Sequence, residues 1–256
     1  MPHLQVLAIQ ADDLCPPALI GEVLRARGIA IHLVNIDRGE SLPAEPGAFD
    51  GLLILGGRQS VLDDGQQQFV LNVNNIIRSY HELERPVLGI CLGAQLVATA
   101  FATRVKRVSE LQFGFAELNF LTDVSEDPLL REVPDHQRVF VWHEDCSDLP
   151  EGAIHLLSTE AVANYGFRLG HNTWGFQCHP EVRLKELRAM LDRGGYLVTK
   201  HLGERGRALL DNIDTEIQEH LNSAMQFGAM IANGWADRIV QAAGDRGLAT
   251  HAETRG

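Results

Sequence analysis

Cys91 is the residue of this chain whose surroundings most favour covalent chemistry. It follows a short apolar run, Val87–Ile90, which suits a buried parallel strand, and it precedes Gln95–Phe101, whose small and apolar residues suit a helix packed on a sheet. Gly89 and Gly93 stand two residues away on either side. This order of strand, nucleophile and helix is typical of a nucleophile elbow, in which small neighbours let strand and helix approach closely. A buried structural cysteine fits the same position, because free cysteines are among the most buried residues.

An elbow at Cys91 would serve nucleophilic catalysis. The turn directs the backbone N–H of the next residue, Leu92, toward the atom under attack, and the start of the helix supplies partial positive charge that stabilises a thiolate. Such a nucleophile needs a base and a group that orients the base, and neither has to be near it in sequence.

His179 and Glu181 are the candidates for those two roles. They follow a second strand-like run, 174–178, and are joined by a stiffening proline. His179 could take the proton of Cys91, while Glu181 could accept a hydrogen bond from the other ring nitrogen, fixing the tautomer and stabilising the imidazolium. A histidine near a carboxylate is by itself a common surface pair, so this interpretation depends on the elbow.

Three ordered motifs resemble those of the class I glutamine amidotransferases. Gly89–Gln95 matches the pattern Gly-x-Cys-x-Gly-x-Gln, His179–Glu181 matches His-Pro-Glu, and a Gly-Gly turn at 56–57 follows a third strand. The resemblance extends over residues 4–190. Residues 141–145, Val-Trp-His-Glu-Asp, indicate a free-standing member similar to the amidotransferase half of GMP synthase.

The resemblance implies cleavage of the γ-glutamyl amide of glutamine by a Cys-His-Glu triad. The amides of Gly57 and Leu92 would hold the oxyanion of the tetrahedral intermediate. The expected substrate-binding residues are Gly56, Gln95, Trp142 and His143. Plainer interpretations stay open, because glycine is the usual residue of a tight turn and an aromatic strand end is often a packing anchor.

Two segments depart from the family pattern. Arg58 stands where a proline is common, which alters loop stiffness or places a cation at the pocket mouth. Around Gly114, residues 112, 113 and 115 are Gln, Phe and Phe, in a segment that often reads Glu-Ile-Gly-Trp. Because of the second departure, the residues do not indicate which γ-glutamyl donor the protein prefers.

The alternation of strands and helices predicts an α/β fold. Expected strands at 4–10, 29–36 and 49–55 alternate with expected helices at 16–27 and 64–83, which indicates parallel crossover units. We therefore predict a doubly wound, mostly parallel, flavodoxin-like sheet flanked by helices. Ligands bind beyond the carboxyl ends of such strands, which is where the Gly-Gly turn and the cysteine fall.

Two units are predicted, a catalytic domain at residues 1–193 and a helical C-terminal extension at 194–256. A helix at 182–193 is expected to be broken by the glycines at 194 and 195. Apolar spacing in the stretch 223–243 indicates packing against the body of the protein, with a second copy or an acceptor enzyme as the other possibility.

Composition narrows the classes of function. The 256 residues carry a net charge of −12, which argues against nucleic acid or an anionic membrane as partner. Four cysteines without Cys-x-x-Cys spacing predict free thiols, and the lack of a signal peptide or long apolar run predicts a cytoplasmic location. No metal motif and no phosphate loop are found, so neither metal nor cofactor is expected. A basic cluster, Arg104–Arg107, is expected to be a solvated hairpin edge without a phosphate site.

Three hypotheses for function remain. The chain could supply ammonia from glutamine to a separate acceptor synthase, or it could hydrolyse γ-glutamyl peptides or γ-glutamyl amines by itself. It could also be a non-catalytic binding module that keeps the fold. The intact cysteine, histidine and glutamate weigh against the third hypothesis.

Overall fold

Five parallel strands form the centre of the fold. The computed structural model describes residues 3–253 apart from 44–46, 48, 122–123 and 135. In the order in which they lie side by side, the parallel strands are β2 (Ala30–Asn35), β1 (Gln5–Gln10), β3 (Gly51–Ile54), β4 (Val87–Ile90) and β10 (Thr173–Phe176). The chain places β2 on one side of β1 and then places β3, β4 and β10 on the other side. This change of side is expected of a doubly wound sheet.

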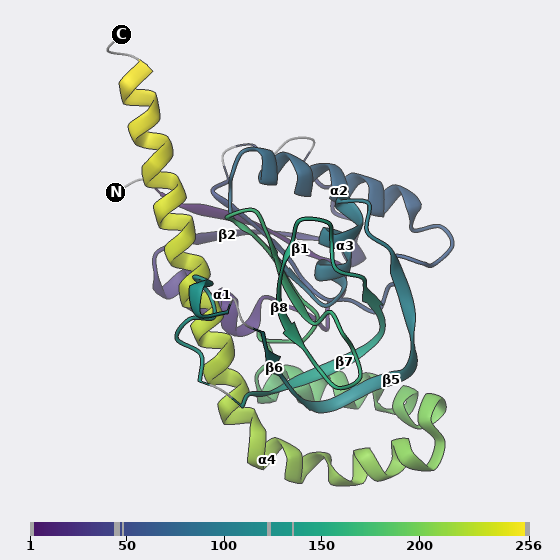
Figure 1. Cartoon of the computed structure of the whole chain (residues 1–256). Coiled ribbons are helices and arrows are strands. Elements are labelled where there is room, and N and C mark those ends of the chain that lie inside the picture. Colours follow the sequence, from purple (N-terminus) through teal and green to yellow (C-terminus); the bar gives the residue numbers. More distant parts are fainter. Residues whose placement is uncertain (1–2, 44–46, 48, 122–123, 135, 254–256) are drawn as a thin grey trace.

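Antiparallel strands complete the sheet and form a second, smaller one. Beyond β10 the main sheet continues with β9 (Gly166–Leu169), β8 (Ile154–Ser158) and β6 (Asn119–Phe120). A separate two-stranded sheet pairs β5 (Val105–Glu117) with β7 (Arg138–Ser147). These two long strands lie over one end of the main sheet (Figure 1).

Helices cover both faces of the main sheet. The structure describes α1 (Ala18–Ala26), α2 (Gln67–Glu82), α3 (Leu92–Ala100) and α4 (Leu184–Glu253), together with the 3₁₀ turns η1 (Ile36–Arg38) and η2 (Val124–Glu126). Along β1, Leu7 and Ile9 face α2 and α3, whereas Val6 and Ala8 face α1 and the last part of α4. Both faces are therefore buried, as the apolar strands predict. The predicted doubly wound α/β fold is confirmed.

The predicted helix break at Gly194 and Gly195 is wrong, because α4 continues through both residues. The non-helical backbone lies instead at Gly203, with φ 58° and ψ −129°. A helical glycine costs only about 1 kcal/mol relative to alanine, and packing outweighs that cost here, since Gly194 lies against the indole of Trp142. A positive φ, in contrast, favours glycine strongly. The predicted boundary between residues 193 and 194 falls inside this helix and stays a prediction.

Two parts of α4 pack on different sheets (Figure 1). Residues on both sides of the kink, Val198 before it and Ile213 and Ile217 after it, join an apolar cluster with β5 and β7. The later part runs beside α1 and buries Phe227, Ile231, Trp235 and Ile239 against the main sheet. The expected packing of this stretch against the body of the protein is confirmed. Within the described residues, no helix, α4 included, has the length and apolar character that a membrane span needs.

Two glycines of α4 should respond to the same substitution with opposite signs. A Cβ at Gly228 would lie 1.9 Å from the carbonyl oxygen of Pro180, so Gly228→Ala should lower the free energy of unfolding by about 1–3 kcal/mol. At Gly244 a Cβ would meet no atom within 4 Å, so Gly244→Ala should raise it by about 0.5–1 kcal/mol. Urea unfolding of both variants tests the packing, and stabilisation by both would contradict it.

Candidate active site

Cys91 occupies a strained turn between β4 and α3. Its φ of 52° and ψ of −108° are unusual for a residue with a side chain. A Cβ at Gly93 would lie 2.1 Å from the carbonyl oxygen of Ile54, and a Cβ at Gly89 would lie 2.5 Å from that of Gly93. Only glycine therefore fits at either position, and the close approach of β3, β4 and α3 holds the cysteine in its turn.

His179 and Glu181 form a buried hydrogen-bonded pair. The imidazole Nδ1 and the carboxylate Oε1 are 2.8 Å apart, and both side chains are almost completely buried. The imidazole Nε2 is buried and has no hydrogen-bond partner among the described residues. Nδ1 thus donates to Glu181, which leaves Nε2 available to a reacting group.

The imidazole and the thiol meet across Gly56. A Cβ at Gly56 would lie 3.0 Å from Cε1 of His179 and 3.5 Å from Cβ of Cys91. Burial alone would lower the pKa of His179, but the carboxylate of Glu181, together with Cys91, raises this pKa well above its ordinary value. The site therefore favours the charged imidazolium form of His179.

Gln177 is a contact of the thiol that the sequence analysis did not single out. Its side-chain nitrogen donates to Sγ of Cys91 at 3.6 Å, and the carbonyl oxygen of Trp142 lies 3.9 Å from the same sulfur. The only sequence signal for Gln177 is its place at the end of β10, two residues before the histidine. The adjacent Cys178 is fully buried, and burial raises the pKa of its thiol, so it stays protonated.

Gly57 and Leu92 both line the cavity that Cys91 lines. In the part of the chain that the structure describes, neither backbone amide donates a hydrogen bond to a protein acceptor. Two unpartnered N–H groups beside a nucleophile form a candidate oxyanion hole. Gly57 also lacks room for a side chain, since a Cβ there would lie 2.6 Å from the side-chain oxygen of Gln59.

A cavity of about 200 Å³ opens above these residues. The sequence-predicted residues that line it are Gly57, Cys91, Leu92, Gln95, Trp142, His143 and His179. Gly56 and Glu181 stand directly behind the imidazole. The structure thus brings all nine predicted site residues together, although they come from four separate segments of the chain.

Asp145 connects the segments around the cavity and was not singled out in the sequence analysis. Its backbone oxygen accepts hydrogen bonds from Gln95 Nε2 and His143 Nδ1, both at 3.0 Å. Its carboxylate accepts a hydrogen bond of 2.5 Å from the hydroxyl of Ser60. Its presence two residues after His143 was the available signal, but contacts with three distant segments cannot be read from spacing.

His143 contacts the cavity with a ring whose nitrogens are both engaged by the protein. Since Nδ1 donates to the Asp145 carbonyl, Nε2 accepts the hydroxyl hydrogen of Tyr165 at 2.9 Å. Burial lowers the pKa of His143 to about 3, so the imidazole is neutral at ordinary pH. Its expected role in substrate binding stays a prediction.

Arg104, Lys106 and Arg107 of the basic cluster at 104–107 are exposed, as expected of a solvated edge. Arg107 differs from the other two because it also lines the cavity, where it forms ion pairs with Glu144 and Asp145. The departure at residue 58 also places a cation at the cavity, because Arg58 lines it and forms an ion pair with the fully buried Asp12.

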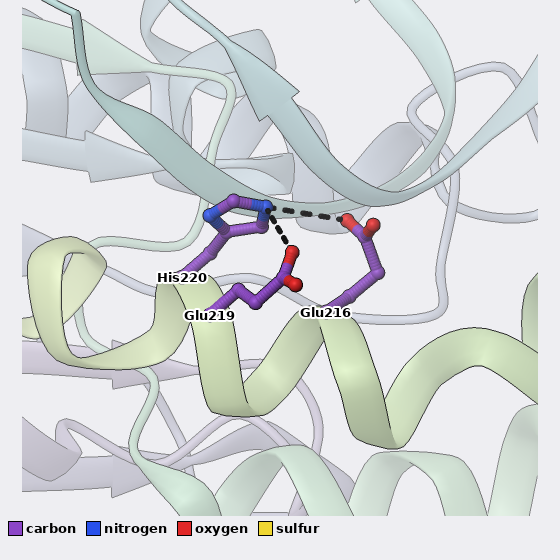
Figure 2. A group of neighbouring side chains, drawn as sticks. All are labelled: Glu216, Glu219 and His220. Atoms are coloured by element: carbon purple, nitrogen blue, oxygen red, sulfur yellow. Dashed lines mark ion pairs between the residues drawn. The ribbon is translucent and has the colours of Figure 1, made fainter.

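Glu216, Glu219 and His220 form a group of possible metal ligands on α4 (Figure 2), and none of the three lines the cavity. Their ligand atoms lie within 4.8 Å of one another. However, Nη1 of Arg138 lies 2.8 Å from Nε2 of His220. This Nε2 is also the ring nitrogen that faces the carboxylates of Glu216 and Glu219. Because a guanidinium can only donate, it occupies the lone pair that a metal would need. We therefore interpret the group as a polar cluster around Arg138, which also lies 3.9 Å from the carboxylate of Glu216.

The fold and the site define an α/β protein with a cysteine nucleophile elbow and a buried His–Glu pair. The family model for "Glutamine amidotransferase class-I" matches residues 18–198, and the chain belongs to this family.

Relatives and solved structures agree with this assignment. The glutamine amidotransferase-like protein YfeJ of Salmonella typhimurium is 27% identical over 188 residues, which cover 70% of this chain and 76% of that protein. One subunit of the glutamine-hydrolysing GMP synthase of Methanoculleus marisnigri is 32% identical over 170 residues, covering 64% and 82%. The crystal structure of a glutamine amidotransferase from Thermotoga maritima shares the fold, with a TM-score of 0.77, 24% identity, and coverage of 93% and 99%.

The low pKa of His143 predicts an acid-sensitive fold. Below its ordinary pKa of 6.5 the histidine of the unfolded chain takes up a proton, whereas the folded one does not until about pH 3. The contribution of His143 to the free energy of unfolding is therefore fully present above pH 6.5. It falls as the pH falls, by up to about 1.4 kcal/mol per pH unit. Urea unfolding between pH 8 and 5 should show a flatter pH dependence for His143→Gln than for the unmodified chain. Equal slopes would contradict this role for burial.

Proposed function

We propose that this chain hydrolyses the side-chain amide of glutamine through a γ-glutamyl thioester, releasing glutamate and ammonia. The observation that carries the proposal is the strained, buried Cys91 facing the His179–Glu181 pair across Gly56. A merely structural cysteine requires neither a positive φ nor a hydrogen-bonded base beside it.

The geometry supports a two-step reaction. The thiolate of Cys91 attacks the amide carbon, and the amides of Gly57 and Leu92 stabilise the oxyanion, each donor contributing about 3 kcal/mol to lowering the barrier. The His179 imidazolium then protonates the leaving ammonia, and the γ-glutamyl thioester forms. Water attacks the thioester with His179, now neutral, as base, and glutamate leaves. Glu181 holds the ring in the required tautomer throughout.

The size of the cavity favours a small donor. A volume of about 200 Å³ is below the roughly 300–1,000 Å³ of sites for drug-sized ligands. We assign contacts with the glutamyl group to Gln95 and Trp142, which line the cavity. Gly56 is assigned a supporting role, because it packs between Cys91 and the imidazole of His179.

A separate synthase is the acceptor of ammonia in this proposal. This part of the proposal is supported by the relative from Methanoculleus marisnigri, which is named as one subunit of a GMP synthase. We place the protein in the cytoplasm, because all four cysteines are free thiols, as suits a reducing compartment. Hydrolysis of γ-glutamyl peptides or amines by the chain alone is the alternative, and a comparison of donors decides between the two.

Replacement of the nucleophile should abolish turnover without unfolding the protein. Cys91→Ala removes only the attacking sulfur, so glutamate release should fall to background while the thermal unfolding midpoint stays close to that of the unmodified chain. Cys178→Ala is the matched control, because this cysteine is also buried and burial raises the pKa of its thiol, so activity should survive its loss. Residual glutamate release by Cys91→Ala would refute the covalent mechanism.

A donor panel should separate the two routes. Glutamate release from glutamine is compared with release from γ-glutamyl peptides and γ-glutamyl amines, with Cys91→Ala as blank. Since the cavity is small, we expect glutamine to have the highest kcat/KM, with modest turnover in the absence of a synthase. A larger γ-glutamyl compound that is turned over far better than glutamine would instead establish a self-sufficient hydrolase.

A further inference from the structure

We infer that Arg107 binds the α-carboxylate of the γ-glutamyl donor, and that the enzyme therefore requires a donor whose α-carboxylate is free. This inference rests on the proposed function and deepens it. It concerns a residue outside every family motif, in a basic cluster whose other cations, Arg104 and Lys106, do not line the cavity.

An irregularity in β5 places Arg107 at the cavity. Arg107 is paired directly with Asp145 across the two-stranded sheet, and the next pair joins Gln112 with His143. Between these two pairs, β5 contains the four residues 108–111, whereas β7 contains only Glu144. Bulges of this kind redirect side chains beside functional sites. Here the arginine lines the same cavity as Cys91 and His179, with its side chain 53% exposed.

Two carboxylates hold one edge of the guanidinium. Nε lies 3.1 Å from Oδ1 of the buried Asp145, and Nη1 donates to Glu144. Among the residues that the structure describes, Nη2 has no partner. Arginine carries five N–H donors in a rigid fork, so the anchored group retains both N–H donors of Nη2 for a ligand.

Arg58, the other arginine at the cavity, is bound at both ends of its guanidinium. Its Nε pairs with Asp12 and its Nη2 lies 3.5 Å from Asp37. The buried Asp12 carboxylate needs this charge, because an unpaired buried carboxylate is costly. Arg107 is accordingly the better candidate for a donor ligand.

Arg107 and the nucleophile line one cavity and are linked by a short series of contacts. Gln95 lies one helical turn, about 5.4 Å, beyond Cys91 on α3, and its side chain donates to the Asp145 backbone oxygen. The Asp145 side chain then contacts Arg107. In glutamine, four bonds of about 1.5 Å separate the amide carbon from the α-carboxyl carbon, so an extended donor spans about 5 Å.

The charges around Arg107 also match an amino-acid head group. Glu144 is about one-third exposed beside the guanidinium, so the cavity mouth presents a cation and an anion together. Free glutamine and γ-glutamyl compounds carry an α-carboxylate and an α-ammonium group at this end. A glutamine residue within a polypeptide carries neither, and the proposal excludes it as a donor.

Alkylation of Cys91 tests the inference independently of turnover. One probe is the diazoketone analogue of glutamine, which keeps both α groups, and the other is iodoacetamide, which has neither. Mass spectrometry follows modification of Cys91 in the full chain, in Arg107→Gln and in the matched control Arg104→Gln, which removes an arginine of the same cluster outside the cavity. Arg107→Lys keeps the charge without the fork.

Loss of a charged hydrogen bond should slow diazoketone alkylation of Arg107→Gln by about 10- to 100-fold. Iodoacetamide alkylation should not change, Arg107→Lys should be intermediate, and Arg104→Gln should match the unmodified chain. An unchanged diazoketone rate in Arg107→Gln, or equal slowing with both probes, would overturn the inference. If the diazoketone does not react selectively with Cys91 in the unmodified chain, the proposed function itself fails.

Discussion

The close backbone contact of β3, β4 and α3 is the constraint on which the rest of the site depends. Gly89 and Gly93 permit it, since a side chain at either position would overlap a carbonyl group. The contact holds Cys91 in its strained turn and brings it beside Gly56 in the loop that follows β3, while the amide of Leu92 has no acceptor among the described residues. Binding and catalytic groups from distant segments can then be arranged around one fixed atom.

The histidine depends on a different set of long-range contacts. Its backbone N–H donates to the carbonyl of Phe140 in β7, and the carbonyl of Glu181 accepts from Leu19 at the start of α1, both at 3.0 Å. Gly228 of α4 packs on the intervening proline from behind. Because these contacts fix both ends of the segment, the His179–Glu181 pair keeps its geometry. Burial would lower the pKa of the imidazole, but the carboxylate held beside it, together with Cys91, raises this pKa.

A connected network joins several polar side chains at the cavity. Asp145 joins α3, β5 and the loop after β3 through Gln95, Arg107 and Ser60. A buried carboxylate is tolerated only when it is paired and hydrogen-bonded, so these partners are needed for stability as well as for shape. The same requirement brings a cation to the cavity mouth, where it can contact an anionic ligand.

The sequence by itself determined the elbow, the histidine pair and the doubly wound sheet, because glycine spacing, motif order and apolar runs are local properties of the chain. Only the tertiary structure decided that α4 continues through Gly194 and bends at Gly203, since packing against Trp142 outweighs a weak local preference. It also decided that Arg107, rather than its basic neighbours, lines the cavity. That choice depends on the pairing of β5 with β7 and on the buried charge of Asp145, which are contacts between segments far apart in sequence.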